Sequence, residues 1–351
     1  MKRANKKIYE ALPPMLGGKR RMVDIIGQHF HGKSVCDLFM GGASISLKAK
    51  SMNMQVIGND IARRSVLIGQ ALISNQKEKI TEEDVFSLFV STENEHFVER
   101  NFSPSVFTPE FTCFLDTGFA NARKRATPKR QLLELLLFKL IMATRQFGGF
   151  QVGKQDNEMI ANNQERELLE LASEARGKKI KNILSHPLPI LMRIKDQINR
   201  GVFDNGQVNE IHQLDAFLLL GKLKKEGRRV DTLYLDSPYK NSVVYSSHYK
   251  ILDQILDQKL EVEIEDKAFN KADALASFEK LFALANDVSE KWIISLGYNP
   301  DSDGGIKGEE LLAVVQKFKP AEILYLDHIW AINNLSGKSQ SRNVEYLIVT
   351  K

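Results

Sequence analysis

Short apolar runs alternate with helical patterns at both ends of this chain. Helical spacing places Met22, Ile25, Ile26 and Phe30 on one face of a helix. Seven runs have the length and the content of β-branched and aromatic residues typical of buried strands; they lie near residues 34–38, 55–58, 208–213, 232–235, 291–296, 323–326 and 344–350. Strands that alternate with helices favour a sheet covered on both faces. The pattern therefore predicts an α/β fold with a Rossmann-like, doubly wound sheet.

The middle of the chain has a different character. Strand-like runs are absent from about residue 76 to residue 185, where helical patterns alternate with basic, polar connectors. The longest apolar run there, residues 132–142, is typical of a buried helix. We therefore expect one α/β domain made of residues 1–75 and 186–351, with a mostly helical domain, residues 76–185, inserted into it.

The composition is that of a globular protein without disulfide bonds. Of the 351 residues, 43% are hydrophobic and 26% are charged, which is ordinary for a soluble protein. No apolar run approaches the roughly 20 residues of a membrane span, and the basic N-terminus leads into no apolar signal segment. Cys36 and Cys113 are the only cysteines, which excludes a disulfide framework and a cysteine-rich zinc site. We expect a cytoplasmic protein with no membrane association and no bound metal.

Two glycine turns have features of a nucleotide-binding site. The strand near residues 34–38 leads into a turn with Gly41, and the next strand ends at Asp60, 19 residues after that glycine. This is close to the usual distance between a glycine loop and a ribose-binding acid. The other turn, Gly17-Gly18, allows close approach of the backbone to a ligand, and Lys19 adds a cation for a carboxylate or phosphate. An ordinary surface loop explains this other turn equally well.

The strand near residues 232–235 ends in Asp236-Ser237-Pro238-Tyr239. An acid at the carboxyl end of a parallel strand lies where open α/β sheets bind ligands. Pro238 stiffens the turn, so the Asp236 carboxylate and the Ser237 carbonyl form a fixed pair of acceptors beside the Tyr239 ring. Two acceptors and a stacking ring suit a planar aromatic amine. Turn preferences alone also explain an Asp-Ser-Pro sequence.

Positive charge is concentrated in the expected helical domain. The whole chain has a net charge of +5, whereas residues 121–181 alone carry 13 Lys/Arg and 7 Asp/Glu, or +6. A tail at residues 145–154 adds glycines, aromatics and amides, a composition suited to phosphates and base edges. The candidate nucleic-acid contacts are Arg123, Lys124, Arg125, Lys129, Arg130, Arg145, Gln146 and Gln151. The alternative is a solvated basic face.

Taken in order, the motifs resemble those of the DNA adenine-N6 methyltransferases that use S-adenosylmethionine, in the subgroup related to the deoxyadenosine methylase of enteric bacteria. The matching segments are Leu16-Gly17-Gly18-Lys19, Asp37-Leu38-Phe39-Met40-Gly41, Asp60, Asp215, Asp236-Ser237-Pro238-Tyr239 and Arg342-Asn343-Val344-Glu345. They span nearly the whole chain in the family's order. Ala43 replaces the second loop glycine of the family, and Ser237 replaces the first proline of its Asp-Pro-Pro-Tyr motif. Neither change removes a group that the chemistry needs.

The resemblance implies a Rossmann-like S-adenosylmethionine methyltransferase sheet with an inserted helical target-recognition domain that binds double-stranded DNA. It places the cofactor on Gly17, Gly18, Lys19, Asp37, Phe39, Gly41, Asp60 and Asp215. Within that set, Asp60 binds the ribose and Asp215 reads the adenine amine. It also implies that the catalytic residues are Asp236, Ser237, Pro238 and Tyr239. The first two accept the amino hydrogens of a flipped adenine, and Tyr239 stacks on the base.

The residues alone leave several alternatives open. N4-cytosine methylation uses the same amine chemistry, and a non-catalytic DNA-binding relative would keep the fold. An RNA or protein methyltransferase fits the core but not the basic helical region. C5-cytosine methylation is disfavoured, because it needs a cysteine nucleophile and neither cysteine follows a proline. The family implies a prokaryotic or phage-encoded enzyme. The sequence does not decide the recognition site, the oligomeric state, or whether a separately encoded restriction endonuclease is a partner.

Overall fold

The computed structural model describes residues 7–15, 18–144, 186–238, 245–262, 269, 273–298, 305–326 and 344–351. The chain forms two compact units, each assembled from three segments. The helical unit comprises Met1–Gly18, Arg63–Asp204 and Tyr245–Glu263, and the α/β unit comprises Lys19–Ala62, Asn205–Val244 and Ile264–Lys351. The helical unit thus takes in segments on both sides of residues 76–185, and the role of target recognition for that range stays a prediction.

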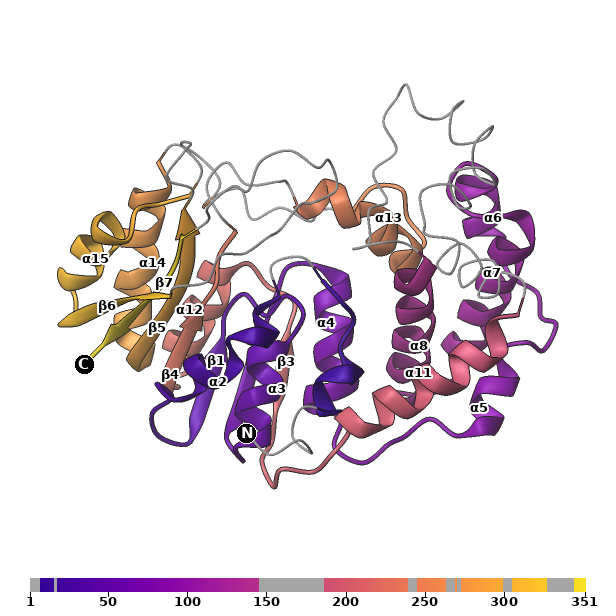
Figure 1. The fold of residues 1–351 in the computed structure, drawn as a ribbon, viewed down its shortest axis with the longest axis horizontal. Helices are drawn as coiled ribbons and strands as arrows, with labels where there is room; N and C mark the ends of the chain where they lie inside the picture. Colours follow the sequence, from indigo (N-terminus) through magenta and orange to yellow (C-terminus); the bar gives the residue numbers. More distant parts are fainter. Residues whose placement is uncertain are drawn as a thin grey trace. The chain divides into compact units, whose positions relative to one another are not determined.

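A seven-stranded sheet forms the centre of the α/β unit (Figure 1). Its strands are β1 (Ser34–Asp37), β2 (Gln55–Asn59), β3 (Glu210–His212), β4 (Val230–Leu235), β5 (Ser289–Tyr298), β6 (Ala321–Leu326) and β7 (Val344–Thr350). Their order in the sheet is β3-β2-β1-β4-β5-β7-β6. The neighbours from β3 to β5 pair in parallel, whereas β7 is antiparallel to both β5 and β6. All seven predicted strands, and the predicted α/β class, are confirmed.

Helices cover both faces of this sheet (Figure 1). The helical elements of the unit are η2 (Lys19–Arg21), α2 (Val23–Gly27), α3 (Ser44–Ser51), α12 (Ala216–Lys225), α14 (Ala274–Val288) and α15 (Gly308–Gln316). Side chains from α12, α14 and α15 form one core with alternate residues of the strands, among them Leu233, Leu235 and Ile294. Helix α3 packs on the opposite face, over β1 and β2. The predicted amphipathic helix after residue 22 exists but ends early, at Gly27.

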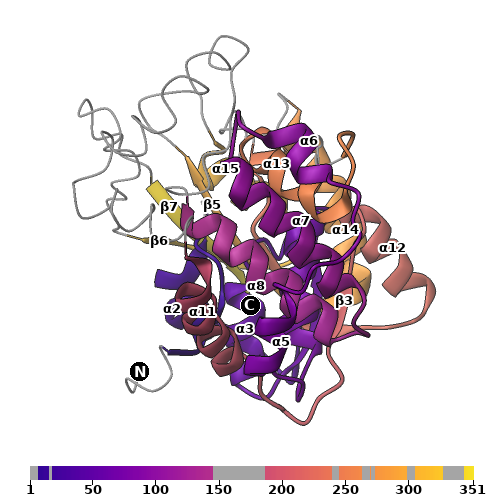
Figure 2. The same cartoon turned by 90° about the vertical axis from the view of Figure 1, so that its right-hand side faces the viewer.

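The described part of the other unit contains helices and no strand. Its elements are η1 (Lys7–Ala11), α4 (Arg63–Gly69), the π-helical turn η3 (Gln70–Ser74), α5 (Glu82–Ser87), α6 (Phe97–Phe102), α7 (Pro109–Arg123), α8 (Lys129–Thr144), α11 (Pro187–Gly201) and α13 (Tyr245–Asp257). Helix α8 packs against both α7 and α11 (Figure 2). Every residue from Leu132 to Met142 is buried, which confirms the predicted buried helix. None of the described helices has the length and hydropathy of a membrane span.

A buried ion pair joins two helices of the helical unit that are distant in sequence. The Arg64 guanidinium on α4 pairs with the Asp253 carboxylate on α13, and the backbone N–H of Arg64 donates to Asp253 Oδ1 at 2.9 Å. The same guanidinium lies over the Tyr249 ring, 5.0 Å from its centroid. Both charged side chains are at least nine-tenths buried, so the loss of either partner would leave an uncompensated charge. This contact joins two segments that lie outside residues 76–185, one on each side of that range, within one compact unit.

Candidate active site

Four acidic side chains follow neighbouring strands at one edge of the sheet. Asp37 ends β1, Asp60 follows β2, Asp215 follows β3, and Asp236 follows β4. These four strands are adjacent and parallel, so their carboxyl ends meet at the same edge. Open parallel sheets bind their ligands there. The α/β unit therefore brings together the acids that the sequence singled out.

Asp60 holds the glycine loop that follows β1. Its Oδ2 atom accepts a hydrogen bond from the backbone N–H of Gly41 at 2.7 Å, and its Oδ1 atom accepts one from Ala62 at 2.8 Å. Gly41 has φ +50°, and a Cβ atom there would meet nothing nearer than the Phe39 carbonyl oxygen at 4.0 Å. Open space thus lies beside the loop. The sequence did not predict that Asp60 organises the loop.

Ala43, the departure from the family's glycine pattern, also has a left-handed backbone. Its φ is 57° and its ψ is 24°, and its side chain is fully buried. This conformation costs an L-residue with a Cβ roughly 1–2 kcal/mol more than it costs glycine. The family's glycine at this position therefore has a conformational reason, and the alanine is tolerated at some cost in stability.

Asp37 is buried, and only one of its two carboxylate oxygens accepts hydrogen bonds from the described residues. Oδ2 accepts hydrogen bonds from the Ser46 hydroxyl at 2.7 Å and from the Ser46 backbone N–H at 3.1 Å. Oδ1 is buried and has no hydrogen-bond partner among the residues that the structure describes. Burial raises the pKa of Asp37 to about 7; the Ser46 hydrogen bonds oppose the rise, and the nearby charges of Asp236 and Asp60 add to it. A buried acceptor without a partner is suited to a ligand that donates.

Asp215 combines a structural bond with a free oxygen. It caps the N-terminus of α12, where its Oδ1 atom accepts from the backbone N–H groups of Phe217 at 2.8 Å and Leu218 at 3.3 Å. Capping by aspartate is favourable at this position. Oδ2 makes no hydrogen bond to the described residues. The carboxylate can therefore cap the helix and still accept a hydrogen bond from a ligand.

Three aromatic rings gather beside these loops. Phe269 meets Phe39 edge-on with ring centroids 5.4 Å apart, and it stacks on Phe217 with centroids 5.8 Å apart. Phe39 and Phe217 are only partly buried. The sequence prediction included Phe39 but missed the other two. An aromatic two residues after Asp215 was an available signal, whereas Phe269 lies in an acidic stretch without any strand or helix pattern.

Lys19 and Asp236 form a mostly buried ion pair. Lys19 Nζ lies 3.1 Å from Asp236 Oδ1, and their side chains are 5% and 18% exposed. Burial raises the pKa of Asp236 to about 6; the charge and hydrogen bond of Lys19 oppose the rise, and Glu345 adds to it. Ser237 is 2% exposed, and Pro238 follows it. The N-terminal glycine-lysine motif therefore meets the Asp-Ser-Pro motif directly, although the sequence prediction assigned Lys19 to the cofactor.

Five predicted site residues lie outside the described part of the chain. They are Gly17, Tyr239, Arg145, Gln146 and Gln151. The Arg342-Asn343 pair of the last matching motif lies outside it as well. Their predicted roles stay predictions.

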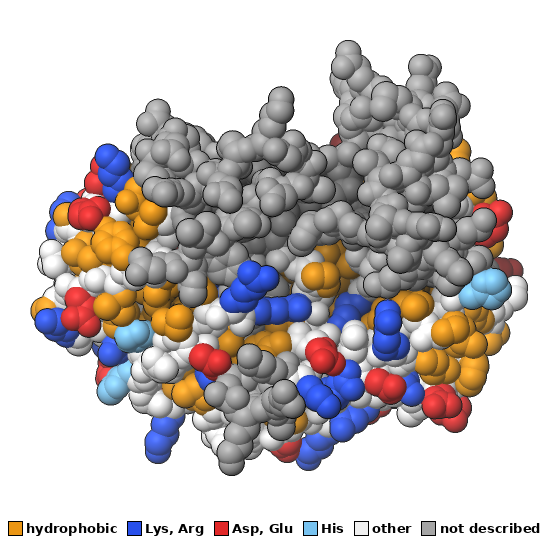
Figure 3. All heavy atoms as spheres, viewed as in Figure 1, with side chains coloured by type: hydrophobic (Ala, Val, Ile, Leu, Met, Phe, Trp, Pro, Cys, Tyr) orange, Lys and Arg blue, Asp and Glu red, His pale blue; other side chains and the backbone are white. Residues whose placement is uncertain are grey.

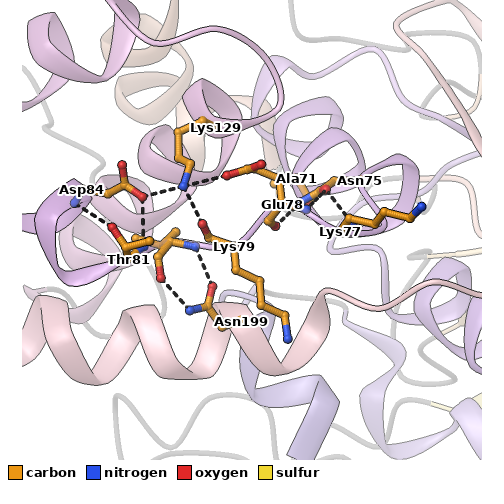
Figure 4. Close-up of polar contacts among 10 residues, drawn as sticks. Ala71, Asn75, Lys77, Glu78, Lys79, Thr81, Asp84, Lys129 and Asn199 are labelled. Atoms are coloured by element: carbon orange, nitrogen blue, oxygen red, sulfur yellow. Dashed lines mark hydrogen bonds and ion pairs between the residues drawn. The ribbon is translucent and has the colours of Figure 1, made fainter.

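Three of the basic side chains predicted to contact DNA have partners within the helical unit. Lys129 Nζ lies 2.5 Å from Asp84 Oδ2 and 2.7 Å from Glu78 Oε1, and it donates to the Lys79 carbonyl at 2.6 Å (Figure 4). Arg123 donates to the carbonyl oxygens of Ile255 and Leu256 at the end of α13, and Arg130 pairs with the buried Glu134 at 2.8 Å. These intramolecular contacts account for the positions of Arg123, Lys129 and Arg130, so no DNA contact is needed to explain them.

The other two described cations are more accessible. Lys124 is exposed and donates to the Thr92 hydroxyl. The Arg125 side chain is exposed and has no ion pair or hydrogen bond to the described residues. On the face drawn in Figure 3, lysine and arginine side chains are interspersed with acidic and apolar ones. Among the five described candidates, Lys124 and Arg125 are therefore the ones most accessible to a phosphate.

Comparison with known proteins supports a DNA methyltransferase family. Residues 16–186 match the family model of the D12 class N6 adenine-specific DNA methyltransferases. The chain is also similar to the type II methyltransferase M2.HphI of Haemophilus parahaemolyticus, with 24% identity over 341 residues that cover 95% of this chain and 96% of that protein. The family description names the N6 amine of adenine, so N4-cytosine methylation is not favoured. Together these two similarities support an adenine-N6 DNA methyltransferase family for this chain.

Proposed function

We propose that this protein methylates adenine in duplex DNA at the carboxyl edge of its sheet, with Asp236 as the principal acceptor for the target amine. The ion pair between Lys19 and Asp236 carries this proposal. A nitrogen with N–H donors already lies 3.1 Å from the carboxylate, so the position accommodates an N–H donor of the kind that an adenine amine presents. Asp236 is also the only one of the four edge acids followed by a proline turn.

The acceptors would make the amine reactive. The lone pair of an adenine amine is delocalised into the ring, so the nitrogen is a poor nucleophile. Two amino hydrogens that donate to the Asp236 carboxylate and the Ser237 carbonyl favour a pyramidal nitrogen with a localised lone pair. The attacking nitrogen gains positive charge, which a mostly buried carboxylate stabilises more strongly than water does. Positioning and electrostatics supply the rate enhancement, without a covalent enzyme intermediate.

The same carboxylate is suited to remove the surplus proton. A nitrogen that has gained a methyl group carries one proton too many and must release it. Asp236 is the group in contact with that nitrogen, and its pKa of about 6 lets it be ionised at neutral pH and still serve as a base. Lys19 favours the ionised form through its positive charge. The ion pair of Lys19 and Asp236 would therefore give the carboxylate both properties: ionisation at neutral pH and the ability to accept a proton.

The residues at the edge fit S-adenosylmethionine as the cofactor. When bound, it supplies an electrophilic methyl group on a sulfonium. Asp60 would hold the ribose, because a carboxylate at that strand end can accept hydrogen bonds from ribose hydroxyls. Asp215 Oδ2 and the buried Asp37 Oδ1 are acceptors for nitrogen or hydroxyl donors, and the partly buried Phe39 and Phe217 offer apolar contact to an adenine ring.

The substrate would be duplex DNA with the target base turned out of the stack, since the amine cannot be reached inside a base pair. Tyr239 is the proposed stacking ring. Among the described basic residues we retain Lys124 and Arg125 as phosphate contacts and treat Arg123, Lys129 and Arg130 as structural. By extension from M2.HphI, a type II methyltransferase, we also propose a role in restriction-modification, with a separately encoded endonuclease as the counterpart.

The test identifies the modified nucleoside. Duplex DNA of mixed sequence is incubated with the protein and methyl-labelled S-adenosylmethionine, digested to nucleosides and separated. We expect the label in N6-methyladenine, with none in a reaction that contains the Asp236→Ala variant. Label in N4-methylcytosine would overturn the choice of base. The absence of label from every nucleoside, across DNA that contains all short sequences, would overturn the proposed activity.

A further inference from the structure

Asn59, the last residue of β2, has a side-chain amide whose hydrogen bonds all go to backbone groups of two neighbouring loops. Its Nδ2 atom donates to the Leu38 carbonyl at 3.1 Å and to the Leu214 carbonyl at 2.9 Å. Its Oδ1 atom accepts from the Leu214 N–H at 3.2 Å. The residue is 1% exposed. The two donor hydrogens and the acceptor oxygen are thus all engaged in joining these two loops.

The two loops that Asn59 joins are those of the proposed cofactor site. Strand β2 lies between β1 and β3, so a side chain at its end reaches the loops on both sides. Leu38 stands between Asp37 and Phe39, and Leu214 immediately precedes Asp215. The Asn59 backbone adds to the connection, because its carbonyl accepts from the Met40 N–H at 2.8 Å. Every loop that contributes a proposed cofactor contact after β1, β2 and β3 therefore adjoins this one residue.

We infer that Asn59 is a positioning residue of the cofactor site, which sets the distance between the glycine loop after β1 and Asp215 after β3. The inference rests on the proposed function, since it takes that edge to bind S-adenosylmethionine. The hydrogen-bond pattern requires an amide, because one short side chain must donate to two carbonyl oxygens and accept from one N–H. Aspartate has the same shape but would place a carboxylate against two carbonyl oxygens. Serine is too short to reach both loops.

A second buried asparagine offers a matched control. Asn209 Oδ1 accepts from the Val56 N–H at 3.0 Å, and Asn209 Nδ2 donates to Asn205 Oδ1 at 2.9 Å. Asn209 is 7% exposed and immediately precedes β3, while Val56 is near the start of β2. It therefore ties the same two strands together at their amino ends, opposite the proposed site. A substitution at Asn209 therefore alters a buried amide at the end of these strands opposite the cofactor loops.

The experiment compares Asn59→Asp with Asn209→Asp in the full chain, together with Asn59→Ser as a milder change. Thermal unfolding and calorimetric titration with S-adenosylmethionine are measured for each folded variant, and KM is measured separately for cofactor and DNA. We expect all three to unfold at lower temperature. The two Asn59 variants should bind the cofactor at least tenfold more weakly and show a raised KM for the cofactor alone. Asn209→Asp should stay within twofold of the wild type.

The outcomes separate the inference from its premise. If Asn59→Ser folds and binds the cofactor within twofold of the wild type, Asn59 is a structural residue only and the inference is overturned. Equal weakening by the Asn209→Asp variant would also overturn it, because general loosening of the sheet would then explain the effect. If the wild-type protein does not bind S-adenosylmethionine, the proposed function fails, whatever the variants do.

Discussion

The ammonium group of Lys19 lies 3.1 Å from Asp236 Oδ1, with both side chains mostly buried in the α/β unit. This pair brings the first and the fifth of the sequence motifs into contact. Its effect on the acid is specific: burial alone favours the neutral carboxyl, and the lysine charge shifts the balance toward the carboxylate. The ionisation of the proposed catalytic acid therefore depends on a residue 217 positions earlier in the chain.

Replacing Lys19 should move the pH dependence of methylation. Asp236 must be ionised to accept the amine, so wild-type kcat/KM should fall about tenfold per pH unit below a pH near 6. Lys19→Met removes the charge that lowers the pKa of Asp236, and the acid limb should shift to higher pH. The matched control is Lys33→Met, an exposed lysine of the same unit. Rates measured from pH 5 to 9 check this; an unmoved acid limb for Lys19→Met would show that the pair does not control ionisation.

Asp60→Asn should weaken cofactor binding and also lower stability. The loss of charge-assisted hydrogen bonds at this carboxylate corresponds to about 1.5–3 kcal/mol, or roughly ten- to a hundredfold in affinity. Asp231→Asn is the control, because Asp231 Oδ2 accepts from the backbone N–H groups of Lys33 and Ser34 at 2.6 and 2.8 Å at the opposite end of the sheet. Calorimetry should find weakened binding for the Asp60 variant alone. Equal affinities for both variants would place the ribose elsewhere.

Ala43→Gly should stabilise the protein by up to about 1 kcal/mol, because glycine adopts φ near 57° without the strain of a Cβ atom. Asn53 has a similar φ of 60°, but asparagine tolerates this region, so Asn53→Gly should gain less. Denaturant unfolding monitored by circular dichroism measures both changes. A lower stability of Ala43→Gly than of the wild type would mean that the buried methyl group contributes more by packing than it costs in strain.

Two neighbouring arginines should behave differently when each is replaced by alanine. Arg123→Ala removes donors to the last carbonyls of α13, so we expect a lower unfolding temperature. Arg125→Ala removes an exposed cation and should leave stability unchanged while it reduces the salt dependence of DNA binding by about 0.9 log units. Fluorescence anisotropy of a short duplex across a salt series measures the slope. An unaltered slope for Arg125→Ala would mean that this residue does not touch a phosphate.

Local patterns predict the sheet and the acids at its edge, because each strand and the acid after it are adjacent in sequence. Contacts between distant segments were not predictable in this way. A charge run cannot show that Lys129 pairs with Asp84 and Glu78 while Arg125 faces solvent. The pairing of Arg64 with Asp253, which binds α4 to α13, likewise leaves no local signal. Such contacts determine which residues belong to the helical unit. The unit therefore extends beyond residues 76–185, the segment that lacks strand patterns.

The most direct test of the account is methyl transfer by the Asp236→Ala variant. Single-turnover rates are measured with duplex DNA and saturating labelled S-adenosylmethionine, alongside calorimetric cofactor binding and duplex binding by anisotropy. The account predicts a rate at least a hundredfold below that of the wild type, with cofactor and duplex binding largely retained, because Asp236 acts on the amine. A rate within tenfold of the wild type would contradict the assignment of Asp236 as the acceptor that activates the adenine amine.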